Sequence, residues 1–347
     1  MDMVLSEFLN KFLILKQKSL LLIFFIVLFI SIFLAISVGS FEIPILDIIY
    51  GKIDSLDKTI LFTIRMPRVI LAAFVGASLA ISGACLQGLF RNPLADPGLI
   101  GVSAGAALGA AFSIVFSANF VSLIYFGPYL IPFSAIIGSA TVIVILFVVT
   151  KGFGYDGVTY MLLAGIAVNA IAGVGIGILT YISDDSELRG LTFWTMGSFG
   201  GVTWPLILPA VIIISLVIVW TIGLSRKLDL IQLGDAEASR LGVDIKKLRF
   251  GVIISSAVVV GISVALSGMI GFVGLIVPHL VRILGGVNHS YVLLSSALFG
   301  SILMIISDML CRTIISPAEL PVGLITSGLG SPFFLWLIFN MRSNNEY

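Results

Sequence analysis

The sequence predicts an all-α, polytopic membrane protein with ten transmembrane helices, and three observations lead to this fold class. Hydrophobic residues make up 59% of the 347 residues and charged residues only 11%, whereas a soluble domain has about 25% charged residues. The mean hydropathy is +1.18. The apolar residues form continuous runs of about 20, which is the length of a helix that crosses a bilayer, and not the alternating segments of a spanning strand.

Ten apolar runs mark the predicted helices. The first is too long for the apolar region of a signal peptide, typically about 7–15 residues, and no small-residue cleavage motif follows it, so we expect a retained helix. Residues 1–18 then form an N-terminal segment, residues 19–342 a single ten-helix domain and residues 343–347 a C-terminal tail. The predicted spans are 19–38, 67–89, 97–117, 122–150, 158–182, 204–224, 250–268, 272–285, 290–311 and 320–341.

Lysine and arginine residues orient these spans. With both termini in the cytoplasm, thirteen of the 19 basic residues fall inside and six outside, which is the bias of the positive-inside rule. Nine spans would reverse the second half of the chain and remove the bias. The six predicted outside are Lys52, Lys58, Arg65, Arg68, Arg189 and Arg312.

The longest polar segment, residues 225–249, is cytoplasmic in this topology. It reads SRKLDLIQLGDAEASRLGVDIKKLR. Gly234 and Gly242 flank a stretch that begins with Asp235, a pattern that predicts a short helix between the two glycines. The residues alone leave open the alternative of a solvated loop with one amphipathic turn.

The predicted spans contain almost no ionisable residues. Asp308 and Arg282 lie near span ends, where we expect their side chains to reach the interface, and no span has a central Asp, Glu or Lys. An ion-driven carrier normally has intramembrane carboxylates or broken helices that hold the ion. The energy for any transport is therefore expected from another source, although backbone groups remain able to bind sodium.

Glycine is abundant instead, with 36 residues. Gly101, Gly105 and Gly109 recur every fourth residue and share one helix face, as do Gly173 and Gly177. Such faces let two helix backbones approach closely, so we expect helix packing at the first three. A translocation path lined by small residues is the alternative interpretation.

Composition and motifs exclude several classes of function. The net charge of +1 gives no basic footprint for nucleic acid. Cys85 and Cys311 belong to no Cys/His cluster, so we expect neither a metal site nor a disulfide framework. The only Gly-Lys pair is followed by Ile53, so the chain lacks the phosphate-binding loop of an ATPase. We expect no catalytic residues and no bound cofactor.

Seven sequence blocks occur in order between about residues 60 and 342. They are RMPR (65–68), SGACLQGLFRNPLADPGLIGVSAGA (82–106), LAGIAVNA (163–170), FWTMGSFGG (193–201), LGDAEASRLGVD (233–244), GFVGLIVPHLVR (271–282) and AELPVGLITSGLGSPFFLWL (318–337). In this order and spacing they resemble the FecCD-type permeases, which are the membrane subunits of type II ATP-binding-cassette (ABC) importers.

The resemblance implies a type II ABC importer permease fold in the bacterial cytoplasmic (inner) membrane. It implies a homodimer with the translocation path at the dimer interface, two cytoplasmic ATPase subunits that bind ATP and Mg, and an extracytoplasmic substrate-binding protein. Substrates of the family are iron chelates such as haem and siderophores, or cobalamin.

The resemblance also assigns roles to residues. Arg65, Arg68 and Arg312 match arginines that dock acidic residues of the binding protein; interfacial anchoring is the alternative for the first two. Val158 and Thr159 match the cytoplasmic gate, where the cobalamin importer has a hydroxyl residue in place of the valine. The matching ATPase-coupling positions are Asp235, Ala238, Ser239, Arg240, Leu241 and Gly242.

The sequence says least about the substrate. The stretch SDDSELRGLTFWTMGSFGG (183–201) is more similar to haem permeases than to cobalamin permeases of the family. We expect His279 and His289 to be structural rather than haem ligands. An iron complex is therefore predicted, with haem favoured and a ferric siderophore next. The alternatives are cobalamin import, an ion-coupled secondary transporter and, with no supporting constellation, a membrane enzyme.

Overall fold

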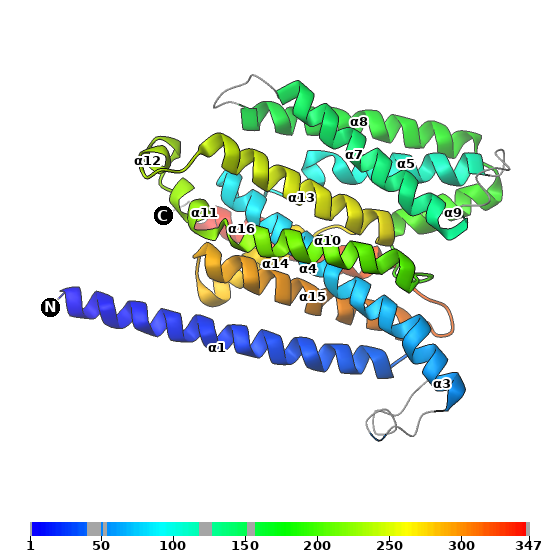
Figure 1. Cartoon of the computed structure of the whole chain (residues 1–347), viewed down its shortest axis with the longest axis horizontal. Helices are drawn as coiled ribbons and strands as arrows, with labels where there is room; N and C mark the ends of the chain where they lie inside the picture. The colour runs from blue at the N-terminus through cyan, green and yellow to red at the C-terminus, as the bar shows by residue number, and fades with distance from the viewer. Residues whose placement is uncertain (1, 40–49, 51–53, 118–126, 151–156, 345–347) are drawn as a thin grey trace.

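The computed structural model describes residues 2–39, 50, 54–117, 127–150 and 157–344, and nearly all of them are helical (Figure 1). The α-helices are α1 (Asp2–Ser37), α3 (Ser55–Thr59), α4 (Met66–Phe90), α5 (Val102–Phe116), α7 (Leu130–Thr150), α8 (Gly157–Ile182), α9 (Asp185–Met196), α10 (Trp204–Ile222), α11 (Ser225–Ile231), α12 (Asp235–Arg240), α13 (Ile245–Ser267), α14 (Val273–Gly285), α15 (His289–Thr313) and α16 (Val322–Asn344). A π-helix, η1 (Ile60–Arg65), and two 3-10 turns, η2 (Pro97–Ile100) and η4 (Gly127–Tyr129), complete the list.

Ten of these helices correspond to the ten predicted spans. Seven described stretches are long and apolar enough to cross a membrane, and three shorter apolar helices lie at the remaining predicted positions. The all-helical membrane fold is therefore confirmed. The seven are Leu13–Ser37, Ser55–Phe90, Gly127–Val149, Tyr160–Ile182, Trp204–Ile222, Ile245–Ser267 and His289–Thr313; the three are Val102–Phe116, Val273–Gly285 and Val322–Leu337.

The second span begins earlier than the sequence suggested. Pro67 indicated a helix start at residue 67, but one continuous stretch runs from Ser55 to Phe90. The π-helix η1 precedes the proline, and the backbone N–H of Met66 donates to the carbonyl of Leu61, five residues back. A π turn changes the hydrogen-bond register of a helix, which lets the chain pass a residue that has no N–H of its own.

Helix α4 is the buried centre of the bundle and packs against α10, α13, α14 and α15 (Figure 1). Two glycines on α4 bring backbones together. A methyl group added at Gly76 would overlap the carbonyl of Gly300 on α15, and one added at Gly83 would overlap the carbonyl of Gly274 on α14. The closest approaches to the central helix therefore depend on glycine.

A second set of close contacts joins α5 to its neighbours. Gly105 lies against Gly138 and Gly109 against Ser134, both on α7. Gly101 precedes α5 as its N-cap, with a φ of 85°, and a methyl group there would lie 3.0 Å from the carbonyl oxygen of Gly165 on α8. The predicted glycine ladder thus faces two helices.

The two ends of the bundle differ. One end carries α11 and α12, and the start of α1 and the end of α16 lie at this same end (Figure 1). The opposite end carries α9, which the sequence did not predict and which begins with a capping box between Asp184 and Glu187. We call them the α12 end and the α9 end. Both described chain termini at one end are what ten crossings require.

Candidate functional site

At the α9 end, Arg68 of α4 lies between two carboxylates. Its Nε is 2.9 Å from Asp308 Oδ1 and its Nη2 is 2.8 Å from the same atom. Its Nη1 donates to both carboxylate oxygens of Glu319, each at 2.9 Å. The Asp308 side chain is 1% exposed and that of Glu319 is 45% exposed. One guanidinium therefore joins a buried acid to a solvent-facing acid.

The other two predicted arginines hold the end of α1. Arg65 Nη1 donates to the carbonyls of Ile36 and Ser37, each at 2.6 Å. Arg312 donates to the carbonyls of Ala35 at 3.1 Å and Val38 at 3.3 Å, and its Nε lies 3.2 Å from Asp308 Oδ2. The last carbonyls of a helix have no intrahelical donors, and cations are favourable beside them.

The structure thus gathers Arg65, Arg68 and Arg312 into one cluster at the α9 end, where all three are buried. Their docking role remains a prediction, because every one of them bonds within the chain. One expectation was wrong: Asp308 does not reach the interface but lies inside the cluster. The spacing of Asp308 and Arg312, one helical turn apart, was a signal that sequence reasoning overlooked.

At the α12 end, residues 225–249 form two short helices, and not one, followed by the first residues of α13. Helix α12 begins directly after Gly234 and ends before Gly242, as predicted, and both glycines have positive φ, 102° and 86°. Helix α11 precedes it and was not predicted. Two apolar residues of α11, Leu228 and Ile231, are fully buried, which explains why this polar-looking stretch is ordered against the bundle.

The predicted coupling residues divide into an outer and an inner set. Ser239, Arg240, Leu241 and Gly242 are exposed, and Leu241 presents 58% of its surface. Ala238 is completely buried. We call residues 239–242 the α12 surface. An exposed leucine at a helix end with charged and small neighbours is suited to fill a pocket on a partner protein.

Asp235, also in the predicted set, anchors α12 to the bundle. It pairs with Arg91, at the end of α4, at 3.2 Å and with Arg249 of α13. The segment ends at Asp244, whose carboxylate accepts the backbone N–H of Lys247 at 3.0 Å. That hydrogen bond and the Lys247 side chain hold the pKa of Asp244 below its usual value.

Two further anchors, one on α11 and one at the residue that follows it, were missed by the sequence reasoning. Asp229 Oδ1 lies 2.6 Å from His289 Nδ1 and accepts the His289 backbone N–H at 2.9 Å. Gln232 Nε2 donates to the carbonyl of Gly88 on α4 at 2.8 Å. The α11–α12 segment is therefore attached to α4, α13 and α15 by polar contacts.

The predicted gate residues and two predicted glycines lie on α8. Val158 and Thr159 lie in the first turn of α8, and their side chains fall outside the described part of the structure. On the same helix, Gly173 and Gly177 are exposed, and a methyl group added at either would meet no atom within 4 Å. This face of α8 is open in a single copy of the chain.

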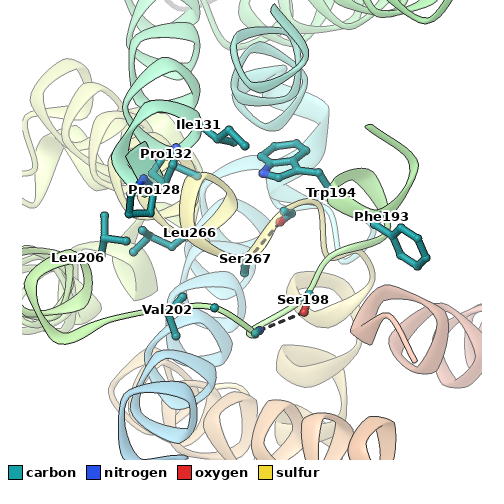
Figure 2. A pocket seen from close by; sticks show the side chains of 14 residues that line it. Pro128, Ile131, Pro132, Phe193, Trp194, Ser198, Val202, Leu206, Leu266 and Ser267 are labelled. Atoms are coloured by element: carbon teal, nitrogen blue, oxygen red, sulfur yellow. Dashed lines mark hydrogen bonds between the residues drawn. The ribbon is translucent and has the colours of Figure 1, made fainter. Parts of the chain in front are cut away.

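One pocket of about 200 Å³ lies at the α9 end among α7, α9, α10 and α13 (Figure 2). Its walls are mainly apolar and include Ile131, Trp194 and Leu206. The Ser267 hydroxyl in the pocket donates to the Ser263 carbonyl at 2.8 Å, and the Ser198 hydroxyl accepts from the Gly200 N–H at 3.1 Å. Pockets for drug-sized ligands measure about 300–1,000 Å³, so this one is too small for a macrocyclic chelate.

The described residues contain no group of three His, Cys, Asp or Glu side chains that could hold a metal ion. His279 packs edge-on against Phe333 of α16, with ring centroids 5.9 Å apart. Cys85 and Cys311 are both buried and free. The candidate functional sites therefore lie at the two ends of the bundle: the arginine cluster at the α9 end and the α12 surface at the α12 end.

Comparison with known proteins finds similarity to one family of transport proteins. The model of the FecCD transport family matches residues 27–340, which begins earlier than the similarity seen by inspection, from about residue 60. The hemin transport system permease HmuU of Yersinia pestis is 45% identical over 82% of this chain and 84% of its own length. The vitamin B12 permease BtuC of Vibrio vulnificus is 36% identical over 86% and 87%.

A further relative and a solved structure are also similar to this chain. The iron(3+)-hydroxamate permease FhuG of Bacillus subtilis is 34% identical over 95% of this chain and 98% of its own length. A solved structure, assigned to a metal-chelate type ABC transporter in an inward-facing conformation, superimposes with a TM-score of 0.82 at 33% identity, covering 93% of this chain and 99% of that one.

Proposed function

The chain belongs to the FecCD transport family, and from this membership we propose that it is the permease subunit of an ATP-driven importer that carries an iron complex across the bacterial cytoplasmic membrane. Haem is the favoured substrate and a ferric siderophore the next. Two copies form the translocation path at their interface. Both termini and the α12 end face the cytoplasm.

The α12 surface is the observation that carries this proposal. Leu241 is exposed directly after α12, in a segment that polar contacts attach to α4, α13 and α15, and the chain itself has no phosphate-binding loop. A transporter built in this way takes its energy from a partner. Residues 239–242 contact a cytoplasmic ATPase, Asp235 and Ala238 hold the helix in place, and ATP with Mg binds to that partner.

The ranking of substrates rests on similarity. The relative named as a hemin permease is 45% identical to this chain, against 36% for the vitamin B12 permease and 34% for the hydroxamate permease. The short 183–201 stretch has the same tendency. Cobalamin import by the same machinery is the alternative, because the matching vitamin B12 permease is 36% identical over 86% of the chain.

The substrate proposal predicts which loaded binding protein activates the complex. In liposomes that contain the permease and its ATPase, the binding protein loaded with haem should stimulate ATP hydrolysis severalfold, and the same protein offered a ferric hydroxamate or cobalamin should not. Stimulation by cobalamin alone would contradict the ranking. Uptake driven by a proton gradient without ATP would contradict the importer class and favour an ion-coupled carrier.

The arginine cluster supports binding-protein docking at the α9 end. Arg68 and Glu319 already form a guanidinium–carboxylate fork at this end, and the Glu319 side chain is half exposed. A carboxylate on a docking protein has the same chemistry and replaces Glu319 at the guanidinium. Arg65 and Arg312 add positive charge beside it while they hold α1.

Arg68→Lys is expected to lower the affinity for the binding protein about tenfold, since lysine keeps the charge but loses one charge-assisted hydrogen bond of the fork. Lysine can still pair with Asp308, so the fold should persist. Arg189→Lys, at an exposed arginine of α9, is the matched control and should bind normally. Surface plasmon resonance with the complex in nanodiscs measures both; equal affinities for Arg68→Lys and the unmodified complex would remove Arg68 from the docking site.

The homodimer is assigned to the open face of α8. Gly173 and Gly177 lie one turn apart on this face with free space around them, and small residues at such spacing allow two helices to approach. The second copy covers this face, and Val158 and Thr159 at the cytoplasmic start of α8 form the gate between the copies.

A further inference from the structure

We propose that His289 is a positioning residue that transmits the movement of the α11–α12 segment to the transmembrane helices. The inference rests on the proposed function, since it requires an ATPase on the α12 surface. It adds a specific link: the Asp229–His289 contact, and not the apolar packing of α11 alone, makes the start of α15 follow the segment.

The contact has the geometry of a rigid link. A single oxygen of Asp229 accepts from the His289 backbone N–H at 2.9 Å and contacts the ring Nδ1 at 2.6 Å. The backbone bond also supplies an acceptor at the N-terminus of α15, where helix N–H groups lack partners. Asp229 therefore holds the main chain and the side chain of His289 at once.

The imidazole is also confined on its far side. A methyl group added at Gly88 of α4 would overlap His289 Nε2, so the ring lies directly against the α4 backbone. His289 is 4% exposed, and Nε2 is buried and has no hydrogen-bond partner in the described structure. A displacement of Asp229 consequently moves the ring against α4, because no space separates them.

A parallel bond keeps α11 in register with the same part of α4. Gln232, one turn after Asp229, donates to the Gly88 carbonyl at 2.8 Å. Next to Gly88, Gln87 donates to the carbonyls of Gly274 and Leu275 in the first turn of α14 at 3.2 and 3.3 Å. Hydrogen bonds thus connect the α11 region to α4 at Gly88, and α4 in turn to α14. The contact with His289 connects α11 to α15, so a displacement of α11 acts on all three helices.

The other anchors are less suited to transmit movement to α15. Asp235 pairs with Arg91, whose side chain is 44% exposed, and such pairs are weak and screened by salt. Its second partner, Arg249, is more buried but lies on α13 and not on α15. The Ser290–Ser225 hydroxyl bond, at 3.1 Å, is exposed too. Among the described residues, the Asp229–His289 contact joins the segment to α15 through a carboxylate, and the His289 side chain is only 5% exposed.

The test separates this link from general stability. Asn places its side-chain nitrogen close to the position of His Nδ1, so His289→Asn keeps the donor to Asp229 and His289→Ala removes it. Each variant is combined with a nitroxide spin label at Tyr181→Cys, an exposed position near the end of α8, in the complex with its ATPase; Cys85 and Cys311 are buried. The readouts are ATP hydrolysis, ATPase retention and the change in the label-to-label distance between the two copies on addition of ATP and vanadate.

We expect His289→Ala to retain the ATPase and at least half of its hydrolysis but to lose more than four-fifths of the distance change, and His289→Asn to restore most of it. A full distance change in His289→Ala overturns the proposal. Equal loss in both variants, together with reduced melting temperature, also overturns it, because the role is then merely structural.

A separate variant tests the premise. Leu241→Asp should release the ATPase, whereas Val287→Asp, at an exposed position of the same end outside the α12 surface, should not. If Leu241→Asp keeps the ATPase bound, the proposed function of the α12 surface fails. A released ATPase in Leu241→Asp with an unchanged distance response in His289→Ala leaves the proposed function intact and rejects only the link.

Discussion

Asp308→Ala should be among the most destabilising single substitutions in this protein, with an expected loss of about 3–5 kcal/mol, the usual cost of removing one partner of a buried ion pair. The Asp308 carboxylate lies between the guanidinium groups of Arg68 and Arg312 and is 1% exposed. Without it, two cations remain buried near each other, and only Arg68 keeps a carboxylate partner, Glu319.

The measurement is thermal unfolding of the detergent-solubilised protein, followed by fluorescence-detected size-exclusion chromatography. Glu319→Gln is the matched control, because it removes the other carboxylate of the same arginine. That side chain is 45% exposed, and exposed ion pairs contribute about 0–1 kcal/mol. If Asp308→Ala and Glu319→Gln lower the melting temperature equally, the buried carboxylate does not hold the cluster together.

Gly83→Ala is the second substitution with a large expected effect, about 1–3 kcal/mol or more. The added methyl group would overlap the backbone carbonyl of Gly274, and a backbone atom cannot rotate away as the end of a flexible side chain can. Helices α4 and α14 must then separate, and the Gln87 bonds to Gly274 and Leu275 must lengthen.

Gly328→Ala on α16 is the corresponding control, because a methyl group there meets no atom within 4 Å. Since alanine favours a helix over glycine by about 1 kcal/mol, this variant should be neutral or slightly more stable. Melting temperature and the yield of monodisperse protein compare the two. A Gly83→Ala protein as stable as Gly328→Ala would show that α4 and α14 have room to separate.

Hydropathy was sufficient to predict the ten spans, because a bilayer imposes a length and a composition that one sequence displays directly. The same criterion failed for α9 and α11. These helices are short and of mixed polarity, so they look like loops, and their order depends on burial of a few side chains such as Leu191 and Leu228. The early start of the second span was hidden because the π turn before Pro67 leaves no signature in the residue types.

In the candidate sites, too, the sequence indicated some residues but not their partners in the folded chain. The sequence, through the family resemblance, picked out Arg68, but its partners Asp308 and Glu319 lie 240 and 251 residues away along the chain. Likewise His289 and Asp229 are 60 residues apart. Such pairings come from the packing of helices that the spans alone do not order, so the sequence could not predict which side chains each of these residues contacts.

The attachment of α1 has a consequence for how the protein is made. Its C-terminal end is held by Arg312, which lies 277 residues after Ala35, and the start of its apolar stretch by the bond from Gln17 to the Gly285 carbonyl, 268 residues later. The ribosome delivers α1 first, and these partners emerge only near the end of synthesis. During that interval the helix remains in the lipid without its final neighbours, which fits its being the most hydrophobic of the seven long spans.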